Sequence, residues 1–286
     1  MTKLKGVFTA LVTPFHNGKV QLDTYRSLCE RQLQGGVSGL VPCGTTGETP
    51  TLSHQEWSDL IQTAVSVAKG KAPVIAGCGS NSTSKTIAAV QQAKALGADA
   101  GLVVFPYYNK PNPTGLLAHV QAVCAQGLPI VLYHVPGRTG QRLSADQLET
   151  LCRVPGVIAL KEATGDVTLG QQLINRLFDT NVSLLSGDDF TFAALTTMGF
   201  DGVISVISNP APKQTTEWYQ AADSGDVSKI RALRQKLLPV VAALFSSTNP
   251  VPCKGMMAGM GLLQNELRLP LDAEAIPVEN LWKHLK

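Results

Sequence analysis

The sequence predicts an α/β fold, namely a (β/α)8 TIM barrel with a C-terminal helical extension, and two observations support it. Short apolar runs alternate with stretches of helical periodicity, which is the pattern of βαβ units and a parallel sheet. The pattern repeats eight times, which favours a closed barrel, although an open doubly wound sheet with fewer strands is the alternative. The eight predicted strands are residues 7–13, 39–42, 73–77, 100–105, 129–135, 157–161, 182–186 and 202–207.

The first helices between these strands have recognisable ends. Residues 22–33 are predicted as a helix that ends at Gly35-Gly36, because glycine commonly follows a helix C-terminus. Ser53 and Glu56 have the spacing of a capping box, in which each side chain accepts a hydrogen bond from the other residue's backbone. They therefore predict the start of a second helix.

Two later helices and the end of the chain follow the same rules. A helix opens at Thr83 or Ser84 and closes at Gly97, and Ser144 with a glutamine three positions later opens another. After residue 210 the strand pattern stops, so we predict a barrel over residues 1–210 and a helical extension over residues 211–286. Residues 211–265 are expected to be helical, with a final helix over residues 271–286.

Composition excludes several classes of protein. The chain has 286 residues, 44% of them hydrophobic and 16% charged, which is typical of a globular core and too apolar for disorder. The formal charge of +3 provides no basic stripe for nucleic acid. No apolar run reaches membrane-spanning length, and the first residues lack the apolar core of a signal peptide. We expect a cytoplasmic protein that binds neither nucleic acid nor a membrane.

The metal-binding and redox residues show no characteristic spacing. The six cysteines contain no Cys-x-x-Cys pair, so they are predicted to be reduced residues of the core. The five histidines lack a His-x-x-x-His or similar ligand pattern, so no zinc site is expected. Residues 77–82 only partly resemble a dinucleotide-binding loop, because they follow the third strand and lack a third glycine.

One lysine stands out, because the apolar run of residues 157–160 leads directly into Lys161 and a Thr-Gly-Asp turn follows. This pattern places Lys161 at the carboxyl end of a buried parallel strand. Most lysines keep the ammonium group in water, so a solvated Lys161 is the alternative. An inward-pointing amine, by contrast, loses hydration, which lowers the pKa of such a group and frees it to form a Schiff base.

Other polar residues also follow the predicted strands, where (β/α)8 barrels place their catalytic groups. They supply hydroxyls, backbone N–H groups beside glycines and one guanidinium, which suit a carboxylate ligand. Each has a plainer alternative: a tight turn for residues 44–47, packing or an interface for Tyr107 and Tyr108, core packing for Tyr133, and a surface charge for Arg138. Asp188 and Asp189 are expected in the first turn of a helix.

Three motifs together resemble the dihydrodipicolinate synthase / N-acetylneuraminate lyase family of Schiff-base aldolases. They are Gly-Thr-Thr-Gly-Glu at residues 44–48, Tyr-x-Val-Pro-x-Arg-Thr-Gly at 133–140 and Leu-Lys-Glu-Ala-Thr-Gly at 160–165. The resemblance covers essentially the whole chain. It implies condensation of pyruvate with L-aspartate 4-semialdehyde to 4-hydroxy-tetrahydrodipicolinate, in lysine and diaminopimelate biosynthesis.

The resemblance also implies roles for eight residues. Lys161 would form an imine with pyruvate, Tyr133 would transfer protons, and Thr45 would link it to Tyr108 of a neighbouring subunit. Thr46 would hold the pyruvate carboxylate, and Arg138 the carboxylate of the semialdehyde. Backbone contacts would come from Gly187 and Ile204. The resemblance implies a homotetramer and no metal or organic cofactor, because the protonated imine is itself the electron sink.

Two departures from the family pattern involve a histidine and a regulatory pocket. His134 stands where many relatives have asparagine, and we expect no change of reaction from it. Lysine-inhibited relatives bind lysine near a dimer interface, where Lys85 replaces an acidic residue and Trp57 the usual histidine. A cation there would repel an incoming ammonium, so we predict weak or absent lysine feedback. The other residues of this degenerate pocket would be Thr49, Pro50, His54, Asn81 and Tyr107.

Two other functions compete with this interpretation. The first is a sugar-acid aldolase of the same family, of the N-acetylneuraminate lyase or 2-keto-3-deoxy-gluconate aldolase type, which uses the same imine but another acceptor. Arg138 argues against it, because such enzymes accommodate a polyhydroxylated chain. The second is a catalytically silent binding protein on a barrel scaffold. The joint presence of Lys161, Tyr133, Thr45 and Tyr108 argues against that one.

Overall fold

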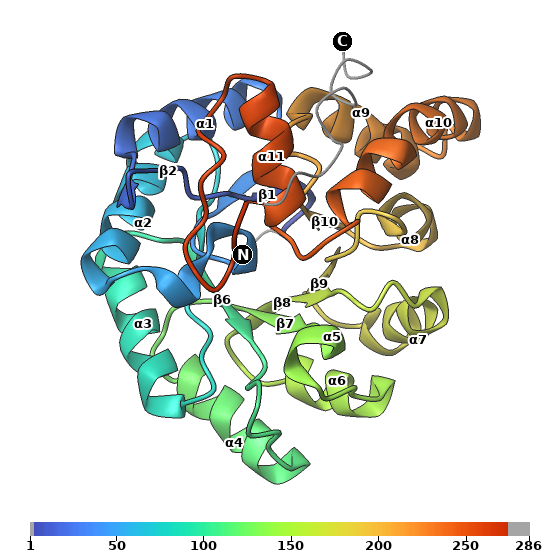
Figure 1. The fold of residues 1–286 in the computed structure, drawn as a ribbon. Coiled ribbons are helices and arrows are strands. Elements are labelled where there is room, and N and C mark those ends of the chain that lie inside the picture. The colour runs from blue at the N-terminus through green and yellow to red at the C-terminus, as the bar shows by residue number, and fades with distance from the viewer. Residues whose placement is uncertain (1–2, 274–286) are drawn as a thin grey trace.

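A computed structural model describes residues 3–273 of the protein. Eight parallel strands form a ring with helices outside it, so the predicted (β/α)8 barrel is confirmed (Figure 1). The hydrogen-bonded order is β4-β1-β10-β9-β8-β7-β6-β5, and a parallel bridge between Leu40 and Val74 joins the two ends of the sheet. The strands are β1 (Gly6–Ala10), β4 (Gly39–Val41), β5 (Ile75–Gly77), β6 (Ala100–Val104), β7 (Ile130–His134), β8 (Val157–Glu162), β9 (Ser183–Ser186) and β10 (Gly202–Ser205).

Each predicted apolar run contains one of these strands, because a strand covered on both faces is apolar along its whole length. Residues on one face of each strand fill the inside of the ring, and those on the other face pack beneath the helices. The sequence did not reveal a small antiparallel hairpin of β2 (Phe15–His16) and β3 (Lys19–Val20). These two-residue strands are too short to show an alternating pattern.

Helices follow the strands around the ring. They are α1 (Leu22–Gln34), α2 (His54–Ala68), α3 (Thr83–Ala95), α4 (Pro113–Cys124), α5 (Pro136–Thr139), α6 (Ala145–Cys152), α7 (Val167–Leu177), α8 (Phe192–Met198) and α9 (Pro212–Asp223), with the short turns η1 (Thr45–Gly47) and η2 (Thr49–Thr51). Both predicted capping boxes are present, at Ser53 with Glu56 and at Ser144 with Gln147.

The helical character predicted after residue 210 is also observed. α9 contacts α8, α1 and β1, so it completes the eighth βα unit, and a boundary at residue 210 separates it from its strand. Two further helices, α10 (Val227–Leu244) and α11 (Val251–Gly259), form the extension proper. The final helix predicted over residues 271–286 lies outside the described residues from 274 onwards, and residues 271–273 are not helical.

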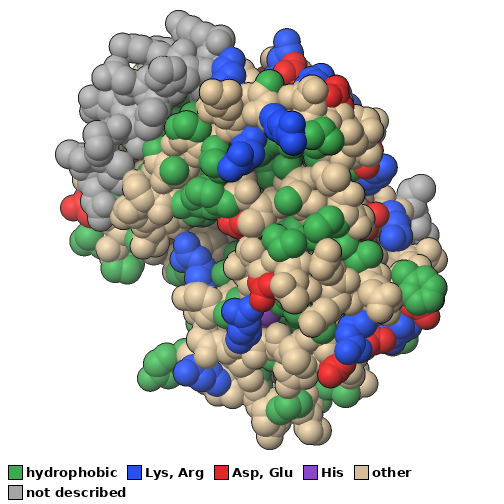
Figure 2. Space-filling view, turned by 90° about the vertical axis from the view of Figure 1, so that its right-hand side faces the viewer, with side chains coloured by type: hydrophobic (Ala, Val, Ile, Leu, Met, Phe, Trp, Pro, Cys, Tyr) green, Lys and Arg blue, Asp and Glu red, His purple; other side chains and the backbone are tan. Residues whose placement is uncertain are grey.

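The surface and the cysteines agree with a globular protein. In Figure 2, basic and acidic side chains are interspersed on the face shown and form no patch of one sign. No helix within residues 3–273 is long and apolar enough to cross a membrane. All six cysteines are free and buried, so the prediction of reduced core thiols is confirmed. Burial raises the pKa of the Cys152 thiol to about 12, which keeps it protonated and unreactive.

Candidate active site

A cavity of about 450 Å³ lies at the carboxyl ends of the strands. Its walls come from the loops after several strands and from residues 245–249, which connect α10 to α11. This is the end of the barrel at which (β/α)8 enzymes carry out catalysis. Six residues predicted from the sequence line it together: Thr45, Thr46, Tyr133, Arg138, Lys161 and Gly187.

Lys161 points into the barrel, and its solvated alternative is wrong. The residue is only 6% exposed, although its ammonium group carries no ion pair to a described residue. Its Nζ lies 4.2 Å from the ring centroid of Tyr133, the directly opposite residue on β7. Strand geometry explains the pairing, because opposed residues of adjacent strands face the same side of a sheet. The pair provides an amine and a phenol in one cavity.

Gly187, for which a backbone contact was predicted, lies against the stem of Lys161. A Cβ at this position would lie 2.8 Å from Cε of Lys161 and 2.6 Å from Cβ of Ala163. The N–H of Gly187 donates to the carbonyl of Glu162 at 2.6 Å and is therefore not available to a ligand. The missing side chain thus makes room for the stem of Lys161.

The turn after β4 has the features of an anion site. Within η1, the N–H groups of Gly47 and Glu48 donate to the carbonyls of Gly44 and Thr45, at 3.0 and 3.1 Å. The N–H groups of Thr45 and Thr46 donate to no acceptor among the described residues, as is usual at the start of a helical turn. Two free N–H groups beside two hydroxyls form a suitable nest for a carboxylate.

Asn249, which no sequence pattern indicated, joins two parts of the site. Its Nδ2 donates to Oγ1 of Thr46 at 2.9 Å, and its carbonyl accepts from Nη2 of Arg138 at 3.1 Å. The Oδ1 of Asn249 is buried and has no partner among the described residues. An Asn-Pro pair indicates only a turn, so no local pattern could have related Asn249 to Thr46 and Arg138, which precede it by 203 and 111 residues.

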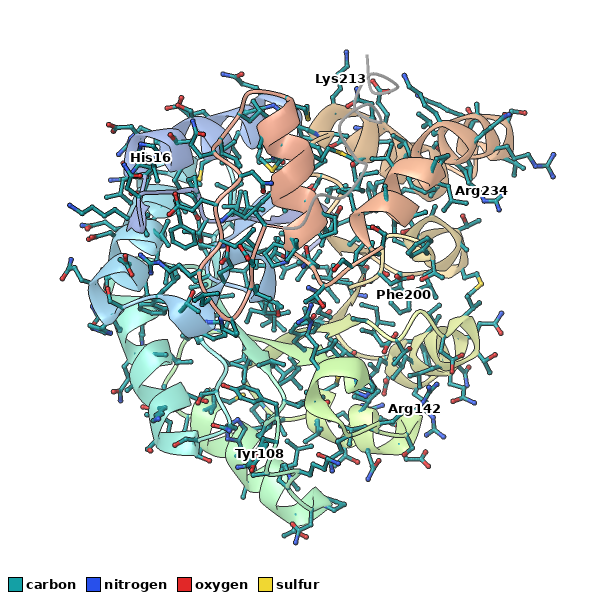
Figure 3. All side chains as sticks on the ribbon, in the orientation of Figure 1. His16, Tyr108, Arg142, Phe200, Lys213 and Arg234 are labelled. Carbon is teal, nitrogen blue, oxygen red and sulfur yellow. The ribbon has the colours of Figure 1, made fainter. Side chains whose placement is uncertain are left out.

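Two predicted residues lie outside the cavity. Ile204 is 1% exposed and packs in the barrel interior with Tyr133, while Val206, two positions later, lines the cavity. Tyr108 is 90% exposed and lies beside α4, away from the ring of strands (Figure 3). Its hydroxyl is therefore not part of the site formed by its own chain.

Asp188 and Asp189 do not form the first turn of a helix, so that prediction is wrong. α8 begins at Phe192, and Asp188 lines the cavity instead. Asp189 is buried, and its Oδ2 accepts from the N–H groups of Val206 and Ile207 at 2.8 and 2.9 Å. This contact fixes the loop after β10. The preference for acidic residues in the first turn of a helix could not predict it, because the two N–H groups lie in another part of the chain.

The comparisons with known proteins agree with this geometry. The model of the dihydrodipicolinate synthetase family matches residues 3–279. The chain belongs to this family. A 4-hydroxy-tetrahydrodipicolinate synthase of Nitratidesulfovibrio vulgaris strain DP4 is 44% identical over 268 residues, which are 93% of this chain and 91% of the relative.

Two solved structures of the family are also similar. The chloride-inhibited dihydrodipicolinate synthase of Acinetobacter baumannii, complexed with pyruvate, is 39% identical with a TM-score of 0.96 and 99% of each chain covered. The enzyme of Cyanidioschyzon merolae with lysine bound is 33% identical with a TM-score of 0.93, covering 100% of this chain and 98% of the other. Both likenesses span the described barrel and its extension.

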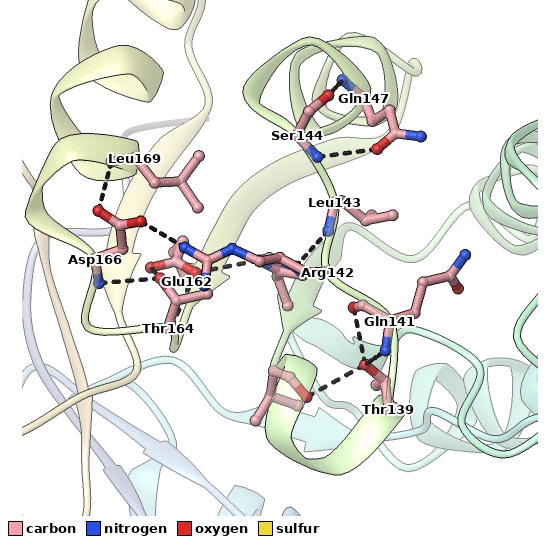
Figure 4. Close-up of polar contacts among 12 residues, drawn as sticks. Thr139, Gln141, Arg142, Leu143, Ser144, Gln147, Glu162, Thr164, Asp166 and Leu169 are labelled. Carbon is pink, nitrogen blue, oxygen red and sulfur yellow. Dashed lines mark hydrogen bonds and ion pairs between the residues drawn. The ribbon is translucent and has the colours of Figure 1, made fainter.

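His134, which was predicted to leave the reaction unchanged, is the residue after Tyr133 on β7. Its Nε2 lies 3.1 Å from the N–H of Leu143 and accepts from it, so Nδ1 carries the proton and donates to Oε1 of Glu162 at 3.1 Å. Glu162 also accepts from the N–H and hydroxyl of Thr164, at 3.0 and 2.9 Å, as Figure 4 shows. The side chains of His134 and Glu162 are buried outside the ring of strands. Both ring nitrogens of His134 therefore have hydrogen-bond partners, and the ring faces away from Lys161.

The residues of the expected family lysine pocket are divided in this chain. Thr49, Pro50 and Tyr107 line a smaller cavity of about 290 Å³ that shares Thr45 and Tyr133 with the larger one. Trp57 is buried, and its Nε1 donates to the carbonyl of Gly77 at 3.0 Å. The ring of His54 stacks on it at 6.2 Å between centroids.

The rest of that set lies nearer the surface. Lys85 is exposed on α3, and the carbonyl of Asn81 accepts from the side chain of Asn109 at 2.8 Å. Across residues 3–273, no three His, Cys, Asp or Glu side chains are close enough together to hold a metal ion.

Proposed function

We propose that this protein is a 4-hydroxy-tetrahydrodipicolinate synthase, which condenses pyruvate with L-aspartate 4-semialdehyde through an imine on Lys161. The observation that carries the proposal is a buried lysine in a cavity, against a tyrosine ring and without a carboxylate partner among the described residues. Such an amine reacts as a nucleophile more readily than one held in an ion pair. The names of the relatives support the synthase over a sugar-acid aldolase.

The first half of the proposed reaction forms the enamine. The amine of Lys161 attacks the keto carbon of pyruvate, and loss of water leaves a protonated imine. Thr46 and the free N–H groups of η1 hold the pyruvate carboxylate. Tyr133 then accepts and donates the protons, including the one that leaves the methyl carbon as the enamine forms. Each such proton transfer contributes on the order of 10²–10⁴ in rate.

In the second half, the enamine carbon attacks the aldehyde of the semialdehyde and forms the new carbon–carbon bond. Arg138 lies at the cavity wall, where its guanidinium can pair with the carboxylate of this substrate. The amino group of the substrate next attacks the imine carbon, which closes the ring and releases Lys161. The protonated imine serves as electron sink, so we propose that neither a metal nor an organic cofactor takes part.

The proposal includes a second copy of the chain. Thr45 would relay protons from Tyr133 to Tyr108 of that copy. Tyr108 is exposed and lies outside its own cavity, so its hydroxyl is free to reach the cavity of a neighbouring chain. We propose a homotetramer made of two tight dimers, with Tyr108 crossing within each dimer, and a cytoplasmic location.

Reduction with borohydride tests the function directly. Incubation with pyruvate and borohydride should add a reduced pyruvyl group to the peptide that contains Lys161, as measured by mass spectrometry. The control variant Lys161→Ala should give no adduct. An unmodified Lys161 in the wild type would refute the proposal. Adduct formation followed by cleavage of sugar acids, with no turnover of the semialdehyde, would identify the other type of aldolase.

A further inference from the structure

The turn that carries Thr45 and Thr46 is attached to the far end of the chain. Beyond the contact of Thr46 with Asn249, the Oε1 of Glu48 lies 2.6 Å from Nζ of Lys254 on α11. The other carboxylate oxygen, Oε2, accepts from the backbone N–H of Arg268 at 3.1 Å. The Nη1 of Arg268 in turn donates to Oε2 of Glu56 on α2 at 2.8 Å. This contact holds the segment after α11 against the barrel. These contacts attach the C-terminal part of the chain to the turn after β4.

The ion pair between Glu48 and Lys254 is fully enclosed. The side chains are 1% and 0% exposed, and Nζ of Lys254 also lies 4.3 Å from the ring centroid of Phe15. Burial lowers the pKa of Lys254, and the neighbouring Glu48 opposes that effect. Because the dehydration of both charges offsets their attraction, a buried ion pair contributes little net stability but fixes the relative position of its partners.

The ion pair between Glu48 and Lys254 controls the position of the turn after β4. Glu48 has a φ of 55°, in the left-handed region that residues with a side chain rarely adopt. Its backbone N–H donates to the carbonyl of Thr45 and so closes η1. A shift of the Glu48 backbone would therefore move Thr45 and Thr46, which line the cavity.

We propose that Lys254 is a positioning residue which, through Glu48, holds η1 in the orientation that binds the carboxylate of the keto acid. This inference rests on the proposed function, because the carboxylate in question is that of pyruvate bound at Lys161. Lys254 itself does not touch the substrate. It acts from α11, within the extension, so the extension becomes part of the machinery that binds pyruvate.

Trapping at increasing pyruvate concentration tests the proposal in the full-length protein. The variant Lys254→Met should need at least about tenfold more pyruvate for half-maximal adduct on Lys161, because the charge-assisted contacts of η1 to the carboxylate are lost. It should reach the same adduct level at saturation, because the amine of Lys161 is unchanged. An unchanged half-saturating concentration would overturn the inference alone. A wild type that gives no adduct would overturn the proposed function and the inference with it.

Two further variants separate positioning from stability. Leu173→Ala removes a buried side chain of α7 and should lower the melting temperature without changing the half-saturating concentration. An equal increase in that variant would attribute the effect to general destabilisation and overturn the inference.

The double variant Glu48→Gln/Lys254→Met leaves no buried charge unpaired, so it should fold even if Lys254→Met does not. It should still need about threefold or more pyruvate, because the attachment of the turn to α11 is lost. A folded double variant with wild-type pyruvate dependence would contradict the assignment of Lys254.

Discussion

At the scale of single residues, the site depends on space and burial as much as on reactive groups. Lys161 reaches the cavity because position 187 has no side chain, and Tyr133 faces it from the neighbouring strand. Thr46 keeps its hydroxyl oriented because Asn249 donates to it. Lys161 and Thr46 are therefore each positioned by a neighbouring residue, which is how enzymes hold groups in a productive geometry.

The clearance at Gly187 leads to the first prediction. Gly187→Ala should reduce the rate of adduct formation by roughly 100-fold, because its Cβ would displace the Lys161 stem, and misplacement of about 1 Å can cost that much. The rate is measured by trapping with borohydride under saturating pyruvate. Gly101→Ala on β6 is the matched control, since its Cβ would meet nothing closer than 3.4 Å. A wild-type rate in Gly187→Ala would show that Lys161 takes another path.

Asp189 leads to a prediction about pH. Burial raises its pKa from the ordinary 3.8 to about 6, so the folded protein holds this proton at pH values where the unfolded chain has released it. Stability linked to Asp189 is thus fully present below pH 3.8 and lost as the pH rises towards 6. At about 1.4 kcal/mol per pH unit, the loss is roughly 3 kcal/mol.

The variant Asp189→Asn does not titrate, so its free energy of unfolding relative to wild type should increase between pH 4 and pH 7. Urea denaturation at each pH measures this difference. Asp23→Asn, at an exposed aspartate of α1, is the control for the loss of one carboxylate. A constant difference between Asp189→Asn and wild type over this range would mean that Asp189 ionises in the folded protein as it does in the unfolded chain.

At the scale of elements, the loops after the strands carry the chemistry and the helices hold those loops in place. η1 binds through its free N–H groups, and its far end is fixed by α11 and by the segment that follows it. α2 and α3 carry three residues of the predicted degenerate lysine pocket, namely His54 and the buried Trp57 on α2 and the exposed Lys85 on α3.

We predict that lysine at sub-millimolar concentration leaves the steady-state rate of this enzyme unchanged. The positive charge of Lys85 repels the ammonium of lysine, and Trp57 already donates its N–H to Gly77. The measurement is the rate of condensation with and without lysine. Lys85→Glu, which replaces the repelling cation with an acidic side chain, should bind lysine more tightly than the wild type. Strong inhibition of the wild type at those concentrations would refute the prediction.

At the scale of the whole molecule, closure of the barrel brings eight loops to one end, and the extension closes part of that end. One chain nevertheless lacks the hydroxyl of Tyr108 in its cavity. The proposed relay is complete only if a second copy supplies it, which makes assembly a condition for full activity.

Tyr108→Phe should therefore lower kcat by roughly 10- to 100-fold, less than the loss of a direct general acid or base. Mixing Tyr108→Phe chains with Lys161→Ala chains should restore activity, because a mixed dimer contains one site with both residues intact. Steady-state rates after subunit exchange measure this recovery. Wild-type kcat in Tyr108→Phe would remove the relay, and no recovery on mixing would place Tyr108 in its own subunit's site.

The sequence by itself determined the periodic features of this protein. Eight apolar runs, the capping boxes at Ser53 and Ser144, and a lysine at the end of a buried strand follow from local spacing, because strand and helix periods are properties of short segments. The motif at residues 44–48 and Lys161 could be assigned to one end of the barrel, because both come at the carboxyl ends of predicted strands and all parallel strands end on the same side.

Only the tertiary structure decided how distant parts of the chain meet. Asn249 with Thr46, Lys254 with Glu48, and the space that Gly187 leaves for Lys161 involve residues that no local pattern relates. The orientation of Asp189 towards the loop after β10 is of the same kind. Such contacts depend on how a closed barrel packs against its extension, and close packing is a property of the folded chain rather than of any segment.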